Sequence, residues 1–211
     1  MPIDYTKADA TAIGVAFISD NQKVMIAKSD ATNDGSNYRL YWGKNLYNRV
    51  VAGVVTNGNV DGTNTNGYLP KPDGTYQSTP NLSGDFTTWT AGALAEFDGK
   101  ANTAAIIAGY TEHGVSMETR DMCSVLNTFN ASDSFKDWYV PACGQLALMY
   151  LNMTEINAAL AKIGGTALAA GYYWSSSEYS SGDAWYVLFN DGDVSYNGKG
   201  NGRRVLFVRD I

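Results

Sequence analysis

The C-terminal segment, Tyr172 to Ile211, reads YYWSSSEYSSGDAWYVLFNDGDVSYNGKGNGRRVLFVRDI. It combines bulky apolar residues with many Gly, Ser, Asn, Asp and Tyr residues. From Trp185 to Phe189, the two kinds of residue alternate, and this period of two is typical of a strand with one buried face. We therefore expect one face to pack on a core. The other face should carry Tyr and small polar groups, as binding loops do.

The composition of the whole chain indicates a folded protein. Its 211 residues are 45% hydrophobic and 17% charged, which is enough for a substantial core and argues against global disorder. The net charge of −6 argues against a nucleic-acid partner. No apolar run reaches the length of a membrane span, so we expect no membrane insertion. The first residues, MPIDYTKADATAIG, lack the apolar core of a signal peptide, so either this export route is not used or a leader or a preceding domain is missing.

The N-terminal half is predicted to be mainly strand and loop. Residues 12–19 and 22–28 read as a hairpin with a tight turn at Asp20-Asn21. Residues 38–42 and 49–55 fit either short strands or a broken helix. Residues 56–92 hold repeated Asn-Gly and Asp-Gly turns, which predicts a long surface loop inserted in the domain. We expect this loop to be held down by aromatic residues: Tyr68, Tyr76, Phe86 and Trp89.

Helices are predicted in the middle of the chain. One starts near Asn102, and a second starts at Ser116, where Thr119 completes an imperfect capping box. Two more follow, over residues 142–152 and 154–163. Helices and strands are segregated along the chain, which predicts an α+β fold with short, mainly antiparallel strands. We expect a single domain over residues 1–211, with two or three helices and long loops between the elements.

Three pieces together resemble a known group of proteins. They are Asp137-Trp138-Tyr139-Val140-Pro141 with the following Gln145–Met149, then Tyr173-Trp174-Ser175-Ser176-Ser177-Glu178, and then Ala184-Trp185 with Arg204-Val205. Over residues 95–211 the chain resembles C-type-lectin-fold domains of the formylglycine-generating-enzyme-like group. Within that group it looks like the variable proteins of diversity-generating retroelements of gut bacteria and their phages.

The resemblance implies that reverse transcription mutates adenines in the codons of the C-terminal segment. Such drift cannot produce Lys, Glu, Gln, Met or Trp, and residues 179–211 hold only Lys199 and Trp185 of these types. The candidate diversified, ligand-binding positions are Tyr179, Ser181, Asp183, Tyr186, Leu188, Asp191, Asp193, Ser195, Tyr196, Gly198, Gly200, Gly202, Arg204 and Leu206. The fixed scaffold positions are Trp174, Trp185, Val187, Phe189, Val205 and Phe207. Alternation places Leu188 outward, where it could form an apolar-aromatic patch with Tyr179, Tyr186 and Tyr196.

Calcium-dependent sugar binding is a competing chemistry. Asn190, Asp191 and Asp193 offer oxygen ligands, but the segment fails the EF-hand template because position twelve is Gly202 instead of Glu. The Glu-Pro-Asn, Gln-Pro-Asp and Trp-Asn-Asp motifs of calcium-dependent lectins are absent from the sequence. We therefore expect no metal and no cofactor.

Cysteine-based catalysis is also disfavoured. Cys123 and Cys143 fit buried free thiols, a disulfide or a catalytic pair, and no Cys follows Cys143 as formylglycine-generating chemistry would require. The only His, His113, reads as a surface residue. Residues 198–202 mimic a phosphate loop without a following helix. The trio Arg203, Arg204 and Arg209 fits a solvated strand end or an anion site.

The leading prediction is a non-enzymatic, retroelement-diversified receptor-binding protein or adhesin on a phage tail or a bacterial surface. Its partner would be a cell-surface protein or glycan. One alternative is a carbohydrate-binding lectin-like module without programmed diversity. The other is an enzyme related to the formylglycine-generating group.

Overall fold

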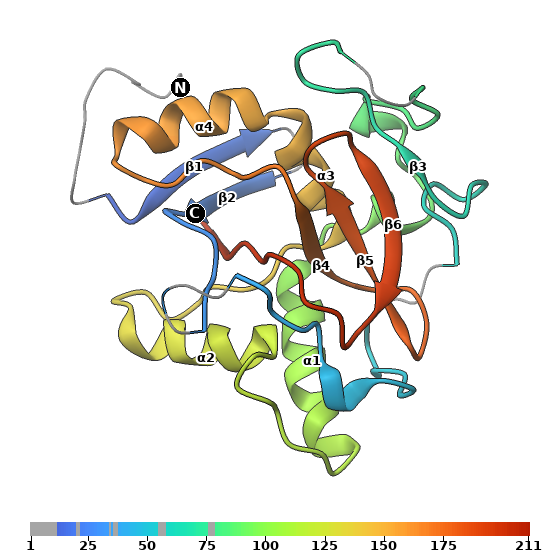
Figure 1. The fold of residues 1–211 in the computed structure, drawn as a ribbon, viewed down its shortest axis with the longest axis vertical. Coiled ribbons are helices and arrows are strands. Elements are labelled where there is room, and N and C mark those ends of the chain that lie inside the picture. Colours follow the sequence, from blue (N-terminus) through green and yellow to red (C-terminus); the bar gives the residue numbers. More distant parts are fainter. Residues whose placement is uncertain (1–11, 20–21, 34, 36–37, 55–57, 76–78) are drawn as a thin grey trace.

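A computed structural model describes residues 12–19, 22–33, 35, 38–54, 58–75 and 79–211. It contains two antiparallel sheets and confirms the α+β prediction (Figure 1). The smaller sheet has the order β1-β2-β7, from β1 (Gly14–Ser19), β2 (Gln22–Ala27) and β7 (Val208–Asp210). The larger sheet has the order β3-β6-β5-β4, from β3 (Gly67–Tyr68), β6 (Asp193–Gly198), β5 (Asp183–Leu188) and β4 (Tyr172–Glu178). The predicted N-terminal hairpin is confirmed by β1 and β2, while its turn lies outside the described residues.

The described residues form four α-helices, rather than two or three. These are α1 (Gly99–Glu112), α2 (Met122–Ser132), α3 (Cys143–Leu151) and α4 (Met153–Lys162). Three short 3-10 turns, η1 (Lys44–Leu46), η2 (Phe86–Thr88) and η3 (Ala93–Ala95), lie in the long connections. In the segments 38–42 and 49–55, where the sequence left strand or helix open, the described residues make only single bridges at Leu40 and Tyr41.

The predicted start of the second helix at Ser116 is wrong. α2 begins at Met122, after Asp121. The Asp121 carboxylate accepts hydrogen bonds from the backbone N–H groups of Glu118 (2.7 Å) and Lys44 (3.0 Å), and the Met122 N–H donates to the Tyr41 carbonyl (2.7 Å). The bond to Glu118 closes a turn before Asp121, and the bonds to Lys44 and Tyr41 tie that turn to a distant part of the chain, so the local capping pattern does not start a helix at Ser116.

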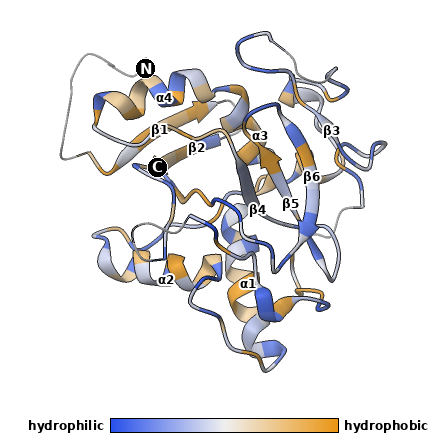
Figure 2. Cartoon of the chain, in the orientation of Figure 1, coloured by the Kyte–Doolittle hydropathy of each residue, from blue (hydrophilic) through white to orange (hydrophobic). Residues whose placement is uncertain are grey.

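Both faces of β5, in the middle of the larger sheet, are buried. On β5, Trp185 and Val187 pack into one hydrophobic cluster with residues of α3 and α4, while Tyr186 and Leu188 pack into a second cluster with residues of α1 and α2. Figure 2 shows hydrophobic colour along β5 at the centre of the molecule. The predicted alternation is therefore present, but it separates two cores. The prediction that Leu188 points outward is wrong, because the residue is only 9% exposed and packs in the second cluster.

The long loop over residues 56–92 contributes to the first of these clusters. Val60, Leu69, Leu82 and Trp89 are all buried in it, and β3 pairs antiparallel with β6 at the edge of the larger sheet. Of the aromatic residues predicted to hold the loop, Trp89 is buried, Tyr68 and Phe86 are partly buried, and Tyr76 lies outside the described residues. The loop therefore acts as a cover for the sheet, held as much by aliphatic as by aromatic side chains.

The two cysteines are buried free thiols, which confirms one of the three interpretations and excludes the disulfide. Cys143 belongs to the first hydrophobic cluster and Cys123 to the second. Burial raises the pKa of both thiols, so neither is an activated thiolate. No helix in the described part of the chain combines the length and apolar character that crossing a bilayer requires.

Candidate functional site

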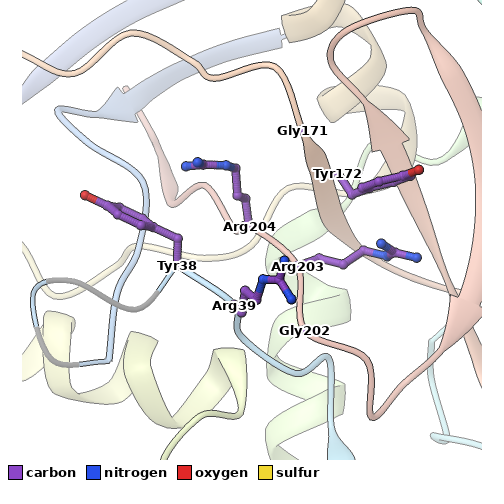
Figure 3. Close-up of a pocket in the computed structure, with 7 residues that line it drawn as sticks. All are labelled: Tyr38, Arg39, Gly171, Tyr172, Gly202, Arg203 and Arg204. Carbon is purple, nitrogen blue, oxygen red and sulfur yellow. The ribbon is translucent and has the colours of Figure 1, made fainter.

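A surface cleft of about 570 Å³ lies beside the first residues of β4. Figure 3 shows the residues that line it: Tyr38, Arg39, Gly171, Tyr172, Gly202, Arg203 and Arg204. Aromatic rings and guanidinium groups dominate this lining. Three guanidinium groups in one cleft make a locally positive region on a chain whose formal net charge is −6.

Backbone hydrogen bonds bring three distant segments together to form the cleft. The Arg204 N–H donates to the Tyr172 carbonyl (2.9 Å), and Trp174 N–H donates back to the Arg204 carbonyl (2.9 Å). On the other side, Arg203 and Leu40 exchange two backbone hydrogen bonds of 2.8 and 2.9 Å. The segment around Arg203 thus runs as an extended strand between β4 and residue 40. In Figure 3 the two consecutive arginines point in opposite directions, as neighbours on an extended chain do.

Arg204 is held by an ion pair within the protein. Its Nη1 lies 2.6 Å from Oδ2 of Asp30, which is buried, and its guanidinium lies 5.0 Å from the ring centroid of Tyr38. The Tyr173 hydroxyl also donates to Asp30 (2.9 Å). Burial raises the pKa of Asp30, against the opposing effect of Arg204 and Tyr173. The buried Asp30 carboxylate is therefore the counter-charge of the Arg204 guanidinium.

Arg203 is instead held by aromatic rings. Its guanidinium carbon lies 4.3 Å from the ring centroid of Tyr172, 4.4 Å from that of Tyr186 and 5.1 Å from that of Trp174. Its Nε is buried and has no hydrogen-bond partner among the described residues. Burial lowers the pKa of Arg203, while the neighbouring Tyr186, Tyr172 and Asp193 oppose that effect. Arg203 is thus a cation oriented by aromatic rings, and its buried Nε has no acceptor in the described part of the protein.

Tyr186 connects the cleft to β6. Its ring meets that of Tyr172 edge-on, with the centroids 5.2 Å apart, and its hydroxyl donates to Oδ2 of Asp193 (3.1 Å). Burial and the Asp193 charge raise the pKa of Tyr186 to about 12, so the hydroxyl keeps its proton at neutral pH. Burial also raises the pKa of Asp193, against the hydrogen bond from Tyr186. Asp193 is therefore the carboxylate whose charge acts on both Tyr186 and Arg203.

A second aromatic group lies on the opposite face of the larger sheet. The rings of Tyr179 and Tyr196 stack in parallel, 3.6 Å apart with an interplanar angle of 3°, and the Trp185 ring meets both edge-on. The predicted patch of Tyr179, Tyr186, Leu188 and Tyr196 is therefore wrong. Adjacent residues of a strand point to opposite faces, so the sheet separates the stacked tyrosines from Tyr186 and Leu188.

The predicted ligand-binding residues divide by accessibility. Ten of the fourteen are partly exposed, namely Tyr179, Ser181, Asp183, Asp191, Asp193, Tyr196, Gly198, Gly200, Gly202 and Arg204. Four are buried: Tyr186, Leu188, Ser195 and Leu206. Leu206 is fully buried in the first hydrophobic cluster, so the prediction that it contacts a ligand is wrong. The six scaffold residues are at most 1% exposed, which confirms their predicted burial.

The cleft contains only two of the predicted residues, Gly202 and Arg204. The sequence prediction missed Tyr38, Arg39 and Tyr172, and it treated Arg203 as part of an arginine trio. That trio is not one site, since Arg209 pairs with Asp137 (2.9 Å) and stacks on Phe135. The sequence does contain one signal for this site, the adjacent pair Tyr172 and Tyr173, because neighbouring residues of a strand point to opposite faces. Only Tyr172 of this pair is exposed, at 42%. Its proximity to Arg203 depends on chain pairing that no local pattern encodes.

The residues considered for metal binding, general-base catalysis and phosphate binding are placed as follows. Within the described residues, no group of three or more His, Cys, Asp or Glu side chains is arranged to hold a metal ion. Asp191 instead accepts the Asp193 N–H (3.2 Å). The partly exposed His113 places Nε2 2.9 Å from the Val50 carbonyl oxygen. Lys199, in the loop that mimics a phosphate site, is fully buried in an ion pair with Glu178.

Comparisons with known proteins give little. No family model matches the chain, and no curated protein matches it. One solved structure to which it is similar is that of a fimbrial protein from Bacteroides ovatus, at 20% sequence identity and a TM-score of 0.47. The similarity covers 55% of this chain and 25% of the fimbrial protein. A likeness this weak carries no argument about fold or function.

Proposed function

We propose that this chain is a non-enzymatic binding protein of the receptor-binding or adhesin type, with a C-type lectin fold. Its C-terminal segment, residues 172–211, recognises cell-surface ligands and is diversified by a retroelement. The protein acts on a phage tail or a bacterial surface. The observation that carries this proposal is the cleft, which the C-terminal segment lines with Tyr172, Arg203 and Arg204.

The composition of the cleft supports a binding role. Tyr and Arg are enriched among residues that dominate binding energy, because they offer large contact areas and several hydrogen bonds. Tyr172, Tyr186 and Arg203 already support one another through ring and cation–π contacts. A site ordered in this way loses less conformational entropy when a ligand binds.

The distribution of residue types supports diversification. Lys199 and Trp185, whose residue types adenine mutagenesis cannot create, are both fully buried. The majority of the candidate diversified positions are partly exposed. Substitutions at those positions would change the surface, whereas changes at the buried positions would disturb the core.

The neighbouring DNA tests diversification directly. We expect a near-identical template repeat of the segment that encodes residues 172–211, a nearby reverse transcriptase gene, and substitutions confined to template adenines among related genomes. A locus with neither repeat nor reverse transcriptase would refute programmed diversity and leave a lectin-like module of fixed sequence.

Binding is tested with intact cells. The purified chain is applied to a panel of bacterial strains and retention is measured by flow cytometry. The variant Tyr172→Ser should lose retention on the strains that bind. Phe135→Ser is the matched control, because Phe135 is 43% exposed and Tyr172 is 42% exposed, and Phe135 lies outside the cleft. Equal retention by both variants would reject the cleft as the binding surface. A glycan array read with and without a chelator separates this proposal from calcium-dependent sugar binding.

A further inference from the structure

The strongest unexplained feature of the cleft is the guanidinium of Arg203. We infer that it is the receptor for a carboxylate on the ligand, and that this carboxylate belongs to an acidic sugar. The inference rests on the proposed binding function and specifies the chemistry of the ligand.

The aromatic contacts of Arg203 fix its orientation without using its hydrogen bonds. A guanidinium has five N–H donors arranged in one plane, and stacking on rings leaves the edges of that plane available. Tyr172, Tyr186 and Trp174 surround the group at 4.3 to 5.1 Å, and its buried Nε has no hydrogen-bond partner among the described residues. Nε is enclosed by the protein, so a ligand in the cleft would meet the two Nη groups, and an anion that accepts from both would gain charge-assisted hydrogen bonds.

The other arginines of the cleft have different roles. Arg204 is already paired with Asp30, which is buried and also receives the Tyr173 hydroxyl. Arg39 is exposed and adds positive potential at the rim of the cleft. The carboxylate that opposes anion binding at Arg203 is Asp193, which the Tyr186 hydroxyl engages. Arg203 is therefore the position where an incoming carboxylate gains most.

The shape and lining of the cleft favour a sugar over an acidic peptide side chain. A volume of about 570 Å³ lies within the range of small-molecule sites and exceeds what one carboxylate side chain would fill. Tyr172 is 42% exposed, and its ring lies beside the guanidinium and offers an apolar surface on which a sugar ring can rest. A uronic-acid unit would place its carboxylate against Arg203 and its ring against Tyr172.

Isothermal titration calorimetry with a galacturonic acid trisaccharide tests this inference. Its carboxyl-reduced, neutral counterpart is the ligand control. We expect the acidic trisaccharide to bind at least about tenfold more tightly, since charge-assisted hydrogen bonds are the stronger kind. Arg203→Gln should remove that preference. Arg203→Lys should restore only part of it, because Lys keeps the charge but lacks the planar fork.

Two further variants separate a local effect from a change in net charge. Arg209→Gln removes the same charge from an arginine that also stacks on a ring, Phe135, outside the cleft, and it should leave affinity unchanged. Asp193→Asn should tighten binding of the trisaccharide by about twofold to fivefold, because it removes a nearby like charge. Melting temperatures identify any variant that fails to fold.

A direct measurement on the unmodified protein avoids dependence on variants. The NMR signal of the Arg203 Nε–H should shift when the acidic trisaccharide is added and stay in place with the neutral one. No binding, an unmoved signal, or tighter binding of a glutamate-rich peptide than of the trisaccharide would overturn the inference. Cell retention that depends on Tyr172 would survive those results, so the proposed function would then stand without a carboxylate ligand. If no strain retains the protein and Arg203 contributes to no binding, both the proposed function and the carboxylate inference are refuted.

Discussion

Lys199 and Glu178 form an ion pair in which neither side chain is exposed to solvent. The Lys199 ammonium also donates to the carbonyl oxygens of Arg49 (2.8 Å) and Ser181 (2.9 Å), and it lies 4.8 Å from the ring centroid of Trp42. The Glu178 carboxylate in turn accepts the Val51 N–H (3.3 Å). Lys199 therefore links the end of β6, in the larger sheet, to the segment that follows η1.

The first prediction concerns that ion pair. Lys199→Met should lower the free energy of unfolding by about 3–5 kcal/mol, because it leaves the Glu178 carboxylate buried without its counter-charge. Denaturant titration measures the change. Lys100→Met is the matched control: it breaks the Lys100–Asp210 pair, whose side chains are 54% exposed, and should change stability by no more than about 1 kcal/mol. Equal effects of the two substitutions would contradict a structural role for the buried pair.

The second prediction tests the two-core interpretation of β5. Trp185→Ala should destabilise the protein by about 3–5 kcal/mol and Leu188→Ala by about 2–5 kcal/mol, because each leaves a cavity in a different hydrophobic cluster. Ile18→Ala, at a β1 position that is 54% exposed, should cost less than about 1 kcal/mol. Thermal and chemical unfolding check all three. A Leu188→Ala effect as small as that of Ile18→Ala would mean that the second face of β5 is open.

The third prediction separates two candidate diversified glycines. A Cβ at Gly202 would lie 2.9 Å from the Arg39 Cβ, whereas a Cβ at Gly200 would meet only the Lys44 side chain at 3.8 Å. Gly202→Ser should therefore destabilise the protein by about 1–3 kcal/mol through crowding. Gly200→Ser should stay within about 0.5 kcal/mol of the parent protein. Sequences of diversified relatives offer an independent check, with wide variation expected at 200 and mainly glycine at 202.

The fourth prediction concerns the turn within the loop over residues 56–92. Burial acts to raise the pKa of Asp61, but hydrogen bonds from Asn64 and Thr63 outweigh it and lower the pKa from 3.8 to about 2. A lowered carboxylate pKa stabilises the folded state above the unfolded value and loses that effect as pH falls through the folded value. The stability difference between the parent protein and Asp61→Ala should thus be constant at neutral pH and shrink between pH 3.8 and about 2. Urea titrations across that range measure it, and a difference that persists unchanged at the acid end would argue against the carboxylate as its source.

Part of the site could be anticipated from local sequence and part could not. The burial of Trp185 and Phe207 follows from bulky apolar residues placed at a period of two, which the chain encodes over a few residues. The hairpin of β1 and β2 and the position of α3 are similarly local. By contrast, the contact between Arg203 and Tyr186 depends on long-range pairing. The segment that contains Arg203 and Arg204 pairs with β4 on one side, and β5, which carries Tyr186, pairs with β4 on the other.

The sequence by itself determined the strand period of the C-terminal segment, its apolar anchors and the separation of strands from helices. These features depend on backbone geometry and side chains within a few residues of each other. Tertiary structure alone decided that both faces of β5 are covered, because α1 and α2 supply the second cluster from a distant part of the chain. It also decided where the cleft lies, since long-range backbone hydrogen bonds from Arg203 to Leu40 and from Arg204 to Tyr172 bring its walls together.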